Sequence, residues 1–137
     1  ANQVVSVERQ TFPELLAAGV SVFGYLDNSY WLDIGTPAAL VKASADLITG
    51  EIKSSATPIH SGDHLISPSA AVASNSIINN GSVIESKVEI ESNCQISGSI
   101  IGSGVKIGAN SRVIDSIIAP NTQIEAGMVV IGNYLGF

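Results

Sequence analysis

Branched apolar residues recur at almost every sixth position through the second half of the chain. The step is six residues throughout, except for two steps of five. An α-helix repeats about every 3.6 residues and a half-buried strand about every two, so neither produces this period. It is typical of a parallel β-helix, in which each hexapeptide supplies one face of a coil. The positions are Ile66, Val72, Ile78, Ile84, Ile90, Ile96, Ile101, Ile107, Val113, Ile118, Ile124 and Val130.

Two further columns run in step with this stripe. The residue three places before each stripe position is Gly, Asn or Asp, except at Ser69 and Lys87, and these three types tolerate a positive φ at a corner. The residue two places before is mostly Ala, Ser, Cys or Thr, small enough for a tight inward bend. Since three faces make a coil, the twelve stripe positions predict about four coils, stacked into a prism about 20 Å tall.

Composition excludes several classes of function. The net charge is −6 and the six basic residues are scattered, so we expect no binding to nucleic acid or to a membrane surface. No apolar run approaches the roughly 18 residues of a membrane span. The single cysteine, Cys94, has no partner for an internal disulfide. The first residues also lack the apolar segment of a signal peptide. These features predict a cytoplasmic protein. The first residues enter ordinary domain sequence without Met, which favours a piece of a longer protein.

Residues 1–50 differ from the repeats and have a mixed α/β pattern. We expect a short helix capped by Thr11 and ended by Gly19, then strands over 20–26 and 30–34. Thr36 and Pro37 begin a longer helix that Gly50 ends. Its expected buried stripe is Leu40, Ala43 and Leu47. Residues 51–65 are rich in Ser, Gly and Pro and are predicted to be a linker, which leaves 66–137 for the β-helix.

Several segments carry a resemblance to the sugar-phosphate nucleotidyltransferases, and within them most closely to the mannose-1-phosphate guanylyltransferases (GDP-mannose pyrophosphorylases). They are Ser6-Val7-Glu8-Arg9, Phe12-Pro13, Gly24-Tyr25 and Tyr30-Trp31-Leu32-Asp33-Ile34-Gly35-Thr36-Pro37. In those enzymes a W-x-D-x-G-T-P segment ends the catalytic domain and is followed by a helix, a linker and a left-handed β-helix. The resemblance therefore implies a fold that is mainly β, a left-handed parallel β-helix preceded by an α/β remnant over 1–50.

The same resemblance implies a parent enzyme that joins a sugar 1-phosphate to a nucleoside triphosphate, with GTP favoured, and releases pyrophosphate. Magnesium would be its cofactor. The family's Gly-rich G-x-G-x-R phosphate loop is missing from this sequence. We therefore expect a C-terminal fragment that holds no catalytic residue and is inactive alone.

Asp33 is the candidate metal ligand. On the expected strand, Trp31, Asp33 and Gly35 face one side while Leu32 and Ile34 face the core. This leaves a carboxylate near a strand end, where ligands of α/β sheets bind. By resemblance Asp33 would hold the Mg²⁺ that bridges the nucleotide and sugar phosphates. The alternative is that Asp33 caps the helix after Gly35.

Other chemically capable side chains have simpler interpretations. His60 and His64 flank an acid, but the stretch has no helix to align them, so we expect solvated linker residues. Cys94 falls in the small-residue column and is expected to pack as a small hydrophobe. Glu85, Glu89 and Glu91 are expected to form a solvated acidic face.

Three other functions compete with the guanylyltransferase hypothesis. One is a fragment of a glucose-1-phosphate adenylyl-, thymidylyl- or uridylyltransferase. Another is a non-catalytic oligomerisation module. A hexapeptide acyltransferase is disfavoured, because no His or insertion interrupts the repeats between Ile66 and Val130. In each case we expect a homo-oligomer in which the β-helix serves assembly or regulation, because the coil stack has an open end and the tail, residues 134–137, is apolar.

Overall fold

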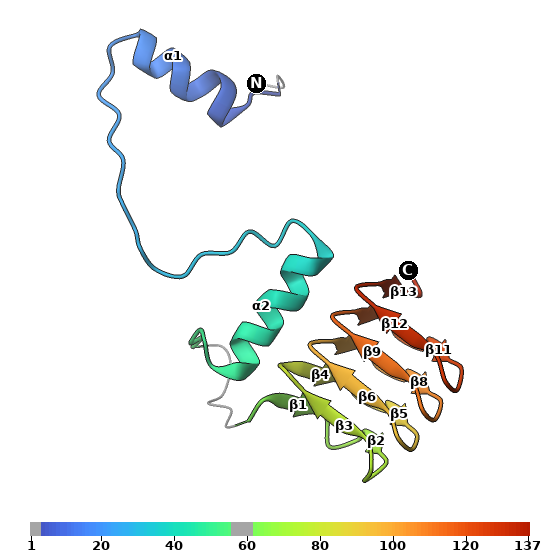
Figure 1. Ribbon diagram of the computed structural model, residues 1–137. Coiled ribbons are helices and arrows are strands. Elements are labelled where there is room, and N and C mark those ends of the chain that lie inside the picture. The colour runs from blue at the N-terminus through green and yellow to red at the C-terminus, as the bar shows by residue number, and fades with distance from the viewer. Residues whose placement is uncertain (1–3, 56–61) are drawn as a thin grey trace. The chain divides into compact units, whose positions relative to one another are not determined.

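The computed structural model describes residues 4–55 and 62–137. The chain divides into two compact units, the first ending at Tyr30 and the second spanning Trp31–Phe137. Figure 1 shows the helices of the first unit in blue and the three-sided stack of coils in green to red. No helix within the described residues is long and apolar enough to cross a membrane.

In the first unit a π-helical turn, η1 (Val7–Thr11), runs into α1 (Phe12–Ala17). Ser6 begins it: its Oγ accepts from the Arg9 N–H at 3.2 Å, and its own N–H donates to Gln10 Oε1 at 2.9 Å. The predicted cap at Thr11 is therefore wrong, because Thr11 already has helical backbone angles and makes no cap hydrogen bond. Gly19 follows α1 with a φ of +71°, as expected for a residue that ends a helix.

The strands expected over 20–26 and 30–34 are not formed. Both segments are irregular, and their aromatic residues are largely exposed. A strand needs a neighbour for its backbone N–H and carbonyl groups, and all strands in the described residues lie between His64 and Leu135 and pair with one another. Strand-like composition alone therefore did not produce a strand in either segment.

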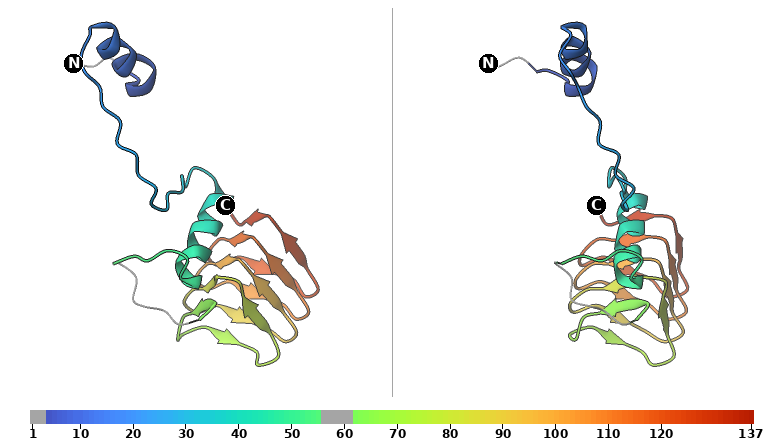
Figure 2. Two further views of the ribbon diagram at one scale, coloured as in Figure 1. Left: turned by 60° about the vertical axis from the view of Figure 1, so that its left-hand side comes forward. Right: turned by 90° about the vertical axis from the view of Figure 1, so that its left-hand side faces the viewer.

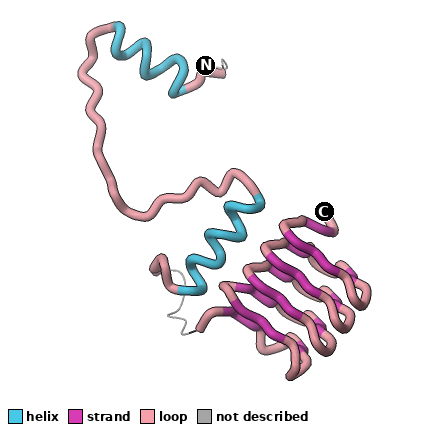
Figure 3. The backbone as a smooth tube through the Cα atoms, in the orientation of Figure 1, coloured by secondary structure: helices cyan, strands magenta, loops and turns pink. Residues whose placement is uncertain are grey.

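The second unit contains the β-helix, and Figure 3 shows its strands in magenta. Sheet A is β1-β4-β7-β10-β13, sheet B is β11-β8-β5-β2, and sheet C is β12-β9-β6-β3, all in parallel register. The strands are β1 (His64–Ile66), β2 (Ala71–Val72), β3 (Ile77–Asn79), β4 (Ser82–Ile84), β5 (Glu89–Ile90), β6 (Gln95–Ser97), β7 (Ile100–Ile101), β8 (Lys106–Ile107), β9 (Arg112–Ile114), β10 (Ile117–Ile118), β11 (Gln123–Ile124), β12 (Val129–Ile131) and β13 (Tyr134–Leu135).

The predicted parallel β-helix of about four coils is confirmed. From Ile84 to Val130 every stripe residue is buried, and Ile66, Val72 and Ile78 in the first coil are partly buried. Its left-handed turn stays a prediction. The fold begins earlier than expected, because β1 includes His64 and Leu65, which pair with Ser82 and Val83. Residues 56–61 of the predicted linker lie outside the described residues.

The corners of the coils lie at the column that was predicted to tolerate a positive φ, three residues before each stripe position. From Gly81 onward each of its residues has a φ between +48° and +75°, including Lys87, which the residue-type rule did not cover. The small-residue column lies inside, where buried hydroxyls link successive coils. Ser82 Oγ accepts from Ser99 N–H at 3.3 Å, and Ser99 Oγ accepts from Ser116 N–H at 3.1 Å. The corner residues with left-handed backbone are Gly81, Lys87, Asn93, Gly98, Gly104, Asn110, Asp115, Asn121 and Gly127.

The long helix α2 (Pro37–Thr49) has the predicted ends. Thr36 Oγ1 accepts from Ala39 N–H at 3.2 Å, and Gly50 ends the helix with a φ of +84°. Figure 2 shows α2 running beside the coil stack, and it contacts β1 and β4.

The predicted buried stripe of α2 is only partly correct. Ala43 is buried as expected, whereas Leu40 is exposed and Leu47 is half-buried. The face that packs carries Val41, Ala45 and Ile48 instead. Both faces of this helix are apolar, so the sequence pattern could not choose between them, and contact with the β-helix decided.

We expect Ile107→Asp to destabilise the chain by more than about 4 kcal/mol, because it places an unpaired carboxylate at a site only 1% exposed. Gln123→Asp, on the exposed outer face of the same sheet, is the control and should leave the free energy of unfolding nearly unchanged. Urea unfolding followed by circular dichroism measures both. Equal midpoints for the two variants would contradict the inward assignment of Ile107.

Candidate functional site

The candidate metal ligand lies in an extended segment that leads into α2. Asp33 is exposed. A Cβ on Gly35 would lie 3.5 and 3.6 Å from the two Asp33 carboxylate oxygens, an ordinary contact distance, so Gly35 lies directly beside the carboxylate. The helix cap that was the alternative role for Asp33 is supplied by Thr36. The carboxylate is therefore available for another ligand.

The side-chain alternation expected around Asp33 is not observed. Leu32 is half-buried, but Ile34 is 56% exposed although it was expected to face the core. The alternation assumed a strand packed on a sheet, and the segment is not a strand in the structure. Asp33 thus takes its position from α2, which follows it, rather than from a sheet.

A groove of about 490 Å³ separates this segment from the last coil of the β-helix. One wall is formed by residues that follow Asp33, namely Ile34 to Pro37, together with Leu40. Ile117, Tyr134 and Phe137 form the other wall. The segment that follows the metal-ligand candidate therefore lies beside the C-terminal end of the β-helix, which is far from it in the sequence.

An apolar column lies on the outside of sheet A, the sheet whose strands β1 and β4 contact α2. Leu65, Val83, Ile100, Ile117 and Tyr134 stand in register, each one residue before an inward stripe position. The corresponding outward residues of sheet B include Glu89, Lys106 and Gln123, which suit solvent. Sequence analysis missed this column. Its signal is an apolar residue beside the stripe at every third hexapeptide.

Gly81 allows α2 to approach the coils closely. A Cβ at this position would overlap Ala45 of α2, and φ is +74°. The corner therefore needs glycine for two separate reasons, its backbone angle and the helix against it.

The donor set near Asp33 is sparse. Within residues 4–55 and 62–137, no three His, Cys, Asp or Glu side chains gather closely enough to hold a metal ion together. Mg²⁺ is commonly held by one or two carboxylates, with substrate phosphates and water completing its shell. A single exposed carboxylate such as Asp33 fits a partial Mg²⁺ site of this kind.

The predictions for the two histidines have different outcomes. His60 lies outside the described residues. His64 belongs to β1 and not to a linker, but its side chain is 39% exposed, in line with the expected contact with solvent. Its Nδ1 lies 2.8 Å from Asp63 Oδ1. The wrong assignment arose because the repeat pattern weakens at its first strand.

Cys94 is buried in the small-residue column, as predicted. Its Sγ lies 3.3 Å from the Gly108 carbonyl oxygen of the following coil, and its backbone N–H donates to Ser76 Oγ of the preceding one at 2.9 Å. It packs as a small hydrophobe between neighbouring coils.

The three glutamates of the expected acidic face are exposed, but they also join coils. Glu85 Oε2 accepts from the Ser103 N–H at 2.9 Å, and Glu91 Oε2 accepts from the Ala109 N–H at 2.9 Å. Glu89 lies 3.1 Å from Lys106 Nζ. Each partner is one coil further along, and Glu85 and Glu91 accept from backbone N–H groups beside the next corner residues, Gly104 and Asn110. The spacing of 18 residues between Glu85 and Ser103 is the signal that sequence analysis missed.

We expect Gly81→Ala to destabilise the chain clearly more than Gly127→Ala. Both glycines have a φ near +75°, so both changes carry a strain of about 1–2 kcal/mol. Only Gly81 faces Ala45, whereas nothing lies within 4 Å of a Cβ at Gly127. The excess, about 1–3 kcal/mol, measures the docking of α2. Equal losses in thermal or urea unfolding would show that the contact with α2 contributes nothing.

Two comparisons place the chain among known proteins. A family model described as "GMPPB C-terminal domain" matches residues 60–135. A mannose-1-phosphate guanylyltransferase of Mycobacterium tuberculosis is 45% identical over 87 residues. That match covers 63% of this chain but only 24% of the relative, so the chain spans much less than the relative's full length. Since the family model covers more than half of the residues, the chain belongs to the GMPPB C-terminal domain family.

Proposed function

We propose that this chain is the C-terminal part of a sugar-1-phosphate nucleotidyltransferase that makes GDP-mannose from GTP and mannose 1-phosphate. One observation carries the proposal: a W-x-D-x-G-T-P segment leads directly into a helix that docks on a hexapeptide β-helix. The 45% identity to a mannose-1-phosphate guanylyltransferase supports guanylyl transfer over the adenylyl, thymidylyl and uridylyl alternatives.

In the proposed reaction a phosphate oxygen of the sugar 1-phosphate attacks the α-phosphorus of GTP. The bond from that phosphorus to the β-phosphate oxygen breaks, and pyrophosphate leaves. A bound Mg²⁺ would neutralise charge on the phosphates. Asp33 is the residue of this chain that would hold the ion. The Asp33 side chain is exposed, and the Thr36 cap fixes the start of α2 after it.

The phosphate-binding loop belongs, in this proposal, to a preceding part of the enzyme. The G-x-G-x-R pattern does not occur in the 137 residues. The β-helix then serves assembly or regulation of a cytoplasmic homo-oligomer. An acyltransferase remains disfavoured, because the sequence has no histidine after His64, the first residue of β1.

We expect the 137-residue chain alone to release no pyrophosphate above background from Mg²⁺, GTP and mannose 1-phosphate, since it lacks a phosphate-binding loop. A coupled pyrophosphate assay measures this, with the mycobacterial relative as the positive control. Turnover by the chain itself would contradict the proposal that it is one part of the catalyst.

Asp33 is tested in a chimera in which this chain replaces the matching region of the mycobacterial enzyme. We expect the chimera to keep guanylyltransferase activity. Asp33→Asn should lower kcat by about a hundredfold or more and raise the Mg²⁺ concentration needed for half-maximal rate, because it removes a charged metal ligand. Mn²⁺ binding followed by electron paramagnetic resonance gives a readout that does not depend on turnover.

Glu51→Gln is the matched control, because Glu51 is another exposed acid, just after α2. It should change neither the rate nor the metal dependence. If Asp33→Asn resembled Glu51→Gln in both measurements, Asp33 would not be a metal ligand. An inactive but folded chimera would argue against guanylyl transfer itself.

A further inference from the structure

The corner between β3 and β4 differs chemically from the other corners of the coils. It is formed by Asn80 and Gly81, the only Asn-Gly pair in the sequence. Asn80 is exposed, and both residues have left-handed backbone, with φ of +53° and +74°. The corner asparagines of the later coils precede residues that carry a side chain, as in Asn93-Cys94. Only the β3–β4 corner therefore has an exposed asparagine next to a glycine.

An asparagine that precedes glycine can react with its own backbone. The glycine nitrogen loses its proton and attacks the side-chain Cγ, and the Cγ–Nδ2 bond breaks to release ammonia. Water then opens the cyclic succinimide at either carbonyl. One opening gives aspartate, and the other gives isoaspartate, in which the main chain runs through the former side chain. Glycine favours the attack because it has no Cβ to hinder the approach.

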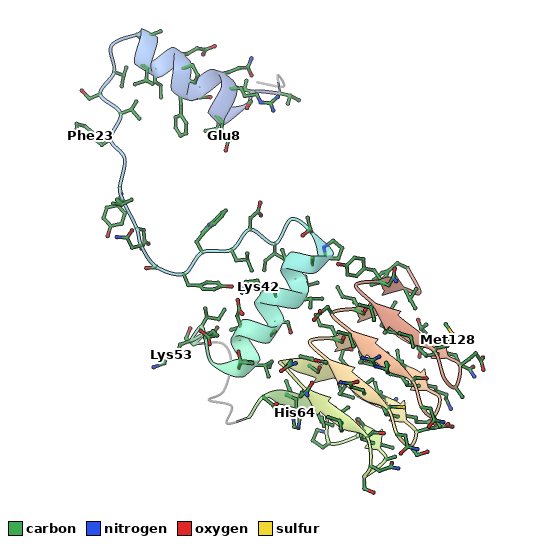
Figure 4. The ribbon with its side chains drawn as sticks, viewed as in Figure 1. Glu8, Phe23, Lys42, Lys53, His64 and Met128 are labelled. Carbon is green, nitrogen blue, oxygen red and sulfur yellow. The ribbon has the colours of Figure 1, made fainter. Side chains whose placement is uncertain are left out.

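Two contacts of the folded chain hold this pair out of the reactive arrangement. Asn80 Nδ2 donates to Ser97 Oγ at 2.8 Å, which holds the side-chain amide away from the backbone. The Gly81 N–H donates to the carbonyl oxygen of Asp63, which keeps the proton on the attacking nitrogen. Asp63 directly precedes β1, whose first residue, His64, is labelled in Figure 4. The reaction therefore requires β1 and the first coil to open.

The first coil is the part of the stack in which such an opening is easiest. Three of its stripe residues are only partly buried, namely Ile66, Val72 and Ile78. Every stripe residue from Ile84 to Val130 is buried. Segments with few buried apolar contacts open locally at a lower free energy than the whole chain unfolds. A hollow of about 240 Å³ that includes Asn80 in its lining also gives the side chain room to turn.

The docked structure has no room for isoaspartate at this corner. Gly81 faces Ala45 of α2, and a Cβ on this glycine would already overlap that residue. Isoaspartate makes the main chain one carbon longer directly before Gly81, so the glycine must shift. The strands that α2 contacts are the ones that adjoin the corner, since Asp63 precedes β1 and Ser82 begins β4. A shift here therefore disturbs the contacts that hold α2.

We propose that Asn80 loses ammonia spontaneously when the first coil opens, and that the isoaspartate formed there releases α2 from the β-helix. The net reaction consumes one water molecule for each ammonia released, and it needs no other reactant. Because the segment that carries Asp33 leads into α2, its position relative to the coils is lost as well. The inference does not depend on the proposed function, since it involves only backbone chemistry and packing.

The first test compares reaction rates in the 137-residue chain at mildly alkaline pH. Peptide mapping by mass spectrometry follows each asparagine, and an isoaspartyl O-methyltransferase labels the isoaspartate. We expect Asn80 to react faster than Asn93. Ser97→Ala should raise the rate at Asn80 about fivefold, because it removes a net hydrogen bond. Ser111→Ala is the control: it removes another buried hydroxyl, which donates to the Glu125 carbonyl instead, and should leave that rate unchanged.

The second test measures hydrogen exchange in α2. Deamidation adds a negative charge, so ion exchange isolates the modified chains. We expect their α2 amides to exchange faster than those of the parent. Asn80→Asp has the added charge without the longer main chain, and its α2 should exchange as in the parent. Circular dichroism shows whether the β-helix stays folded in each sample.

Several outcomes would overturn the proposal. Equal rates at Asn80 and Asn93 would show that the β3–β4 corner is not a special site. Equal effects of the two serine variants would show that the contact with Ser97 does not restrain the reaction. Unchanged α2 exchange in the isoaspartate-containing chains would remove the release of the helix. Faster exchange in Asn80→Asp as well would assign the effect to charge and not to the lengthened main chain.

Discussion

The fit of each coil on the next is the interaction on which the rest of the structure depends. Backbone N–H groups of one coil donate to carbonyls of the following one in all three sheets, as in Val83 to Ser99 and Glu89 to Val105, both at 2.9 Å. The register places Ile on Ile inside, because paired residues are 17 or 18 positions apart. A coil contacts only its immediate neighbours, so stability builds up along the stack as in other repeat proteins. Side chains that bridge coils, such as Ser99 and Glu85, therefore contribute to the stability of the stack, although they are not part of the candidate site.

The second layer of organisation is the helix that joins Asp33 to the β-helix. Most outward positions of a β-helix can be polar, but the outward column of sheet A is apolar. Helix α2 contacts strands of that sheet, and the face it turns toward the β-helix carries Val41, Ala45 and Ile48. The loop containing Asp33 ends at the first residue of this helix. The position of the proposed metal ligand relative to the coils therefore follows from packing of apolar side chains. It does not depend on a polar contact made by Asp33 itself.

The two ends of the coil stack also differ in burial and in composition. The first coil is only partly buried and begins irregularly, whereas the last coil ends in apolar residues without charge. The groove between Pro37 and Phe137 lies at that same end, so the segment that follows Asp33 is a neighbour of the last coil.

What the sequence determined by itself is the part of the fold built from local repetition. The stripe from Ile84 to Val130, the corners at Asn93 and Gly104, and the ends of α2 at Thr36 and Gly50 were all predicted correctly. Each of these depends on a residue's own size, its tolerated φ, or a partner three residues away, and such properties are visible in the sequence. The location of Asp33 just ahead of α2 belongs to this group as well, although its role as a metal ligand remains a prediction.

Only the tertiary structure decided the features that depend on long-range partners. The segments 20–26 and 30–34 have strand-like composition but no strand to pair with, and so they stay irregular. Helix α2 has two apolar faces, and its contact with the β-helix buried the one with Val41 and Ile48. His64 joined β1 because Ser82 lies beside it, eighteen residues later. The contacts that decided the placement of α2 and of His64 join residues far apart in the sequence, and they exist only after the coils have stacked.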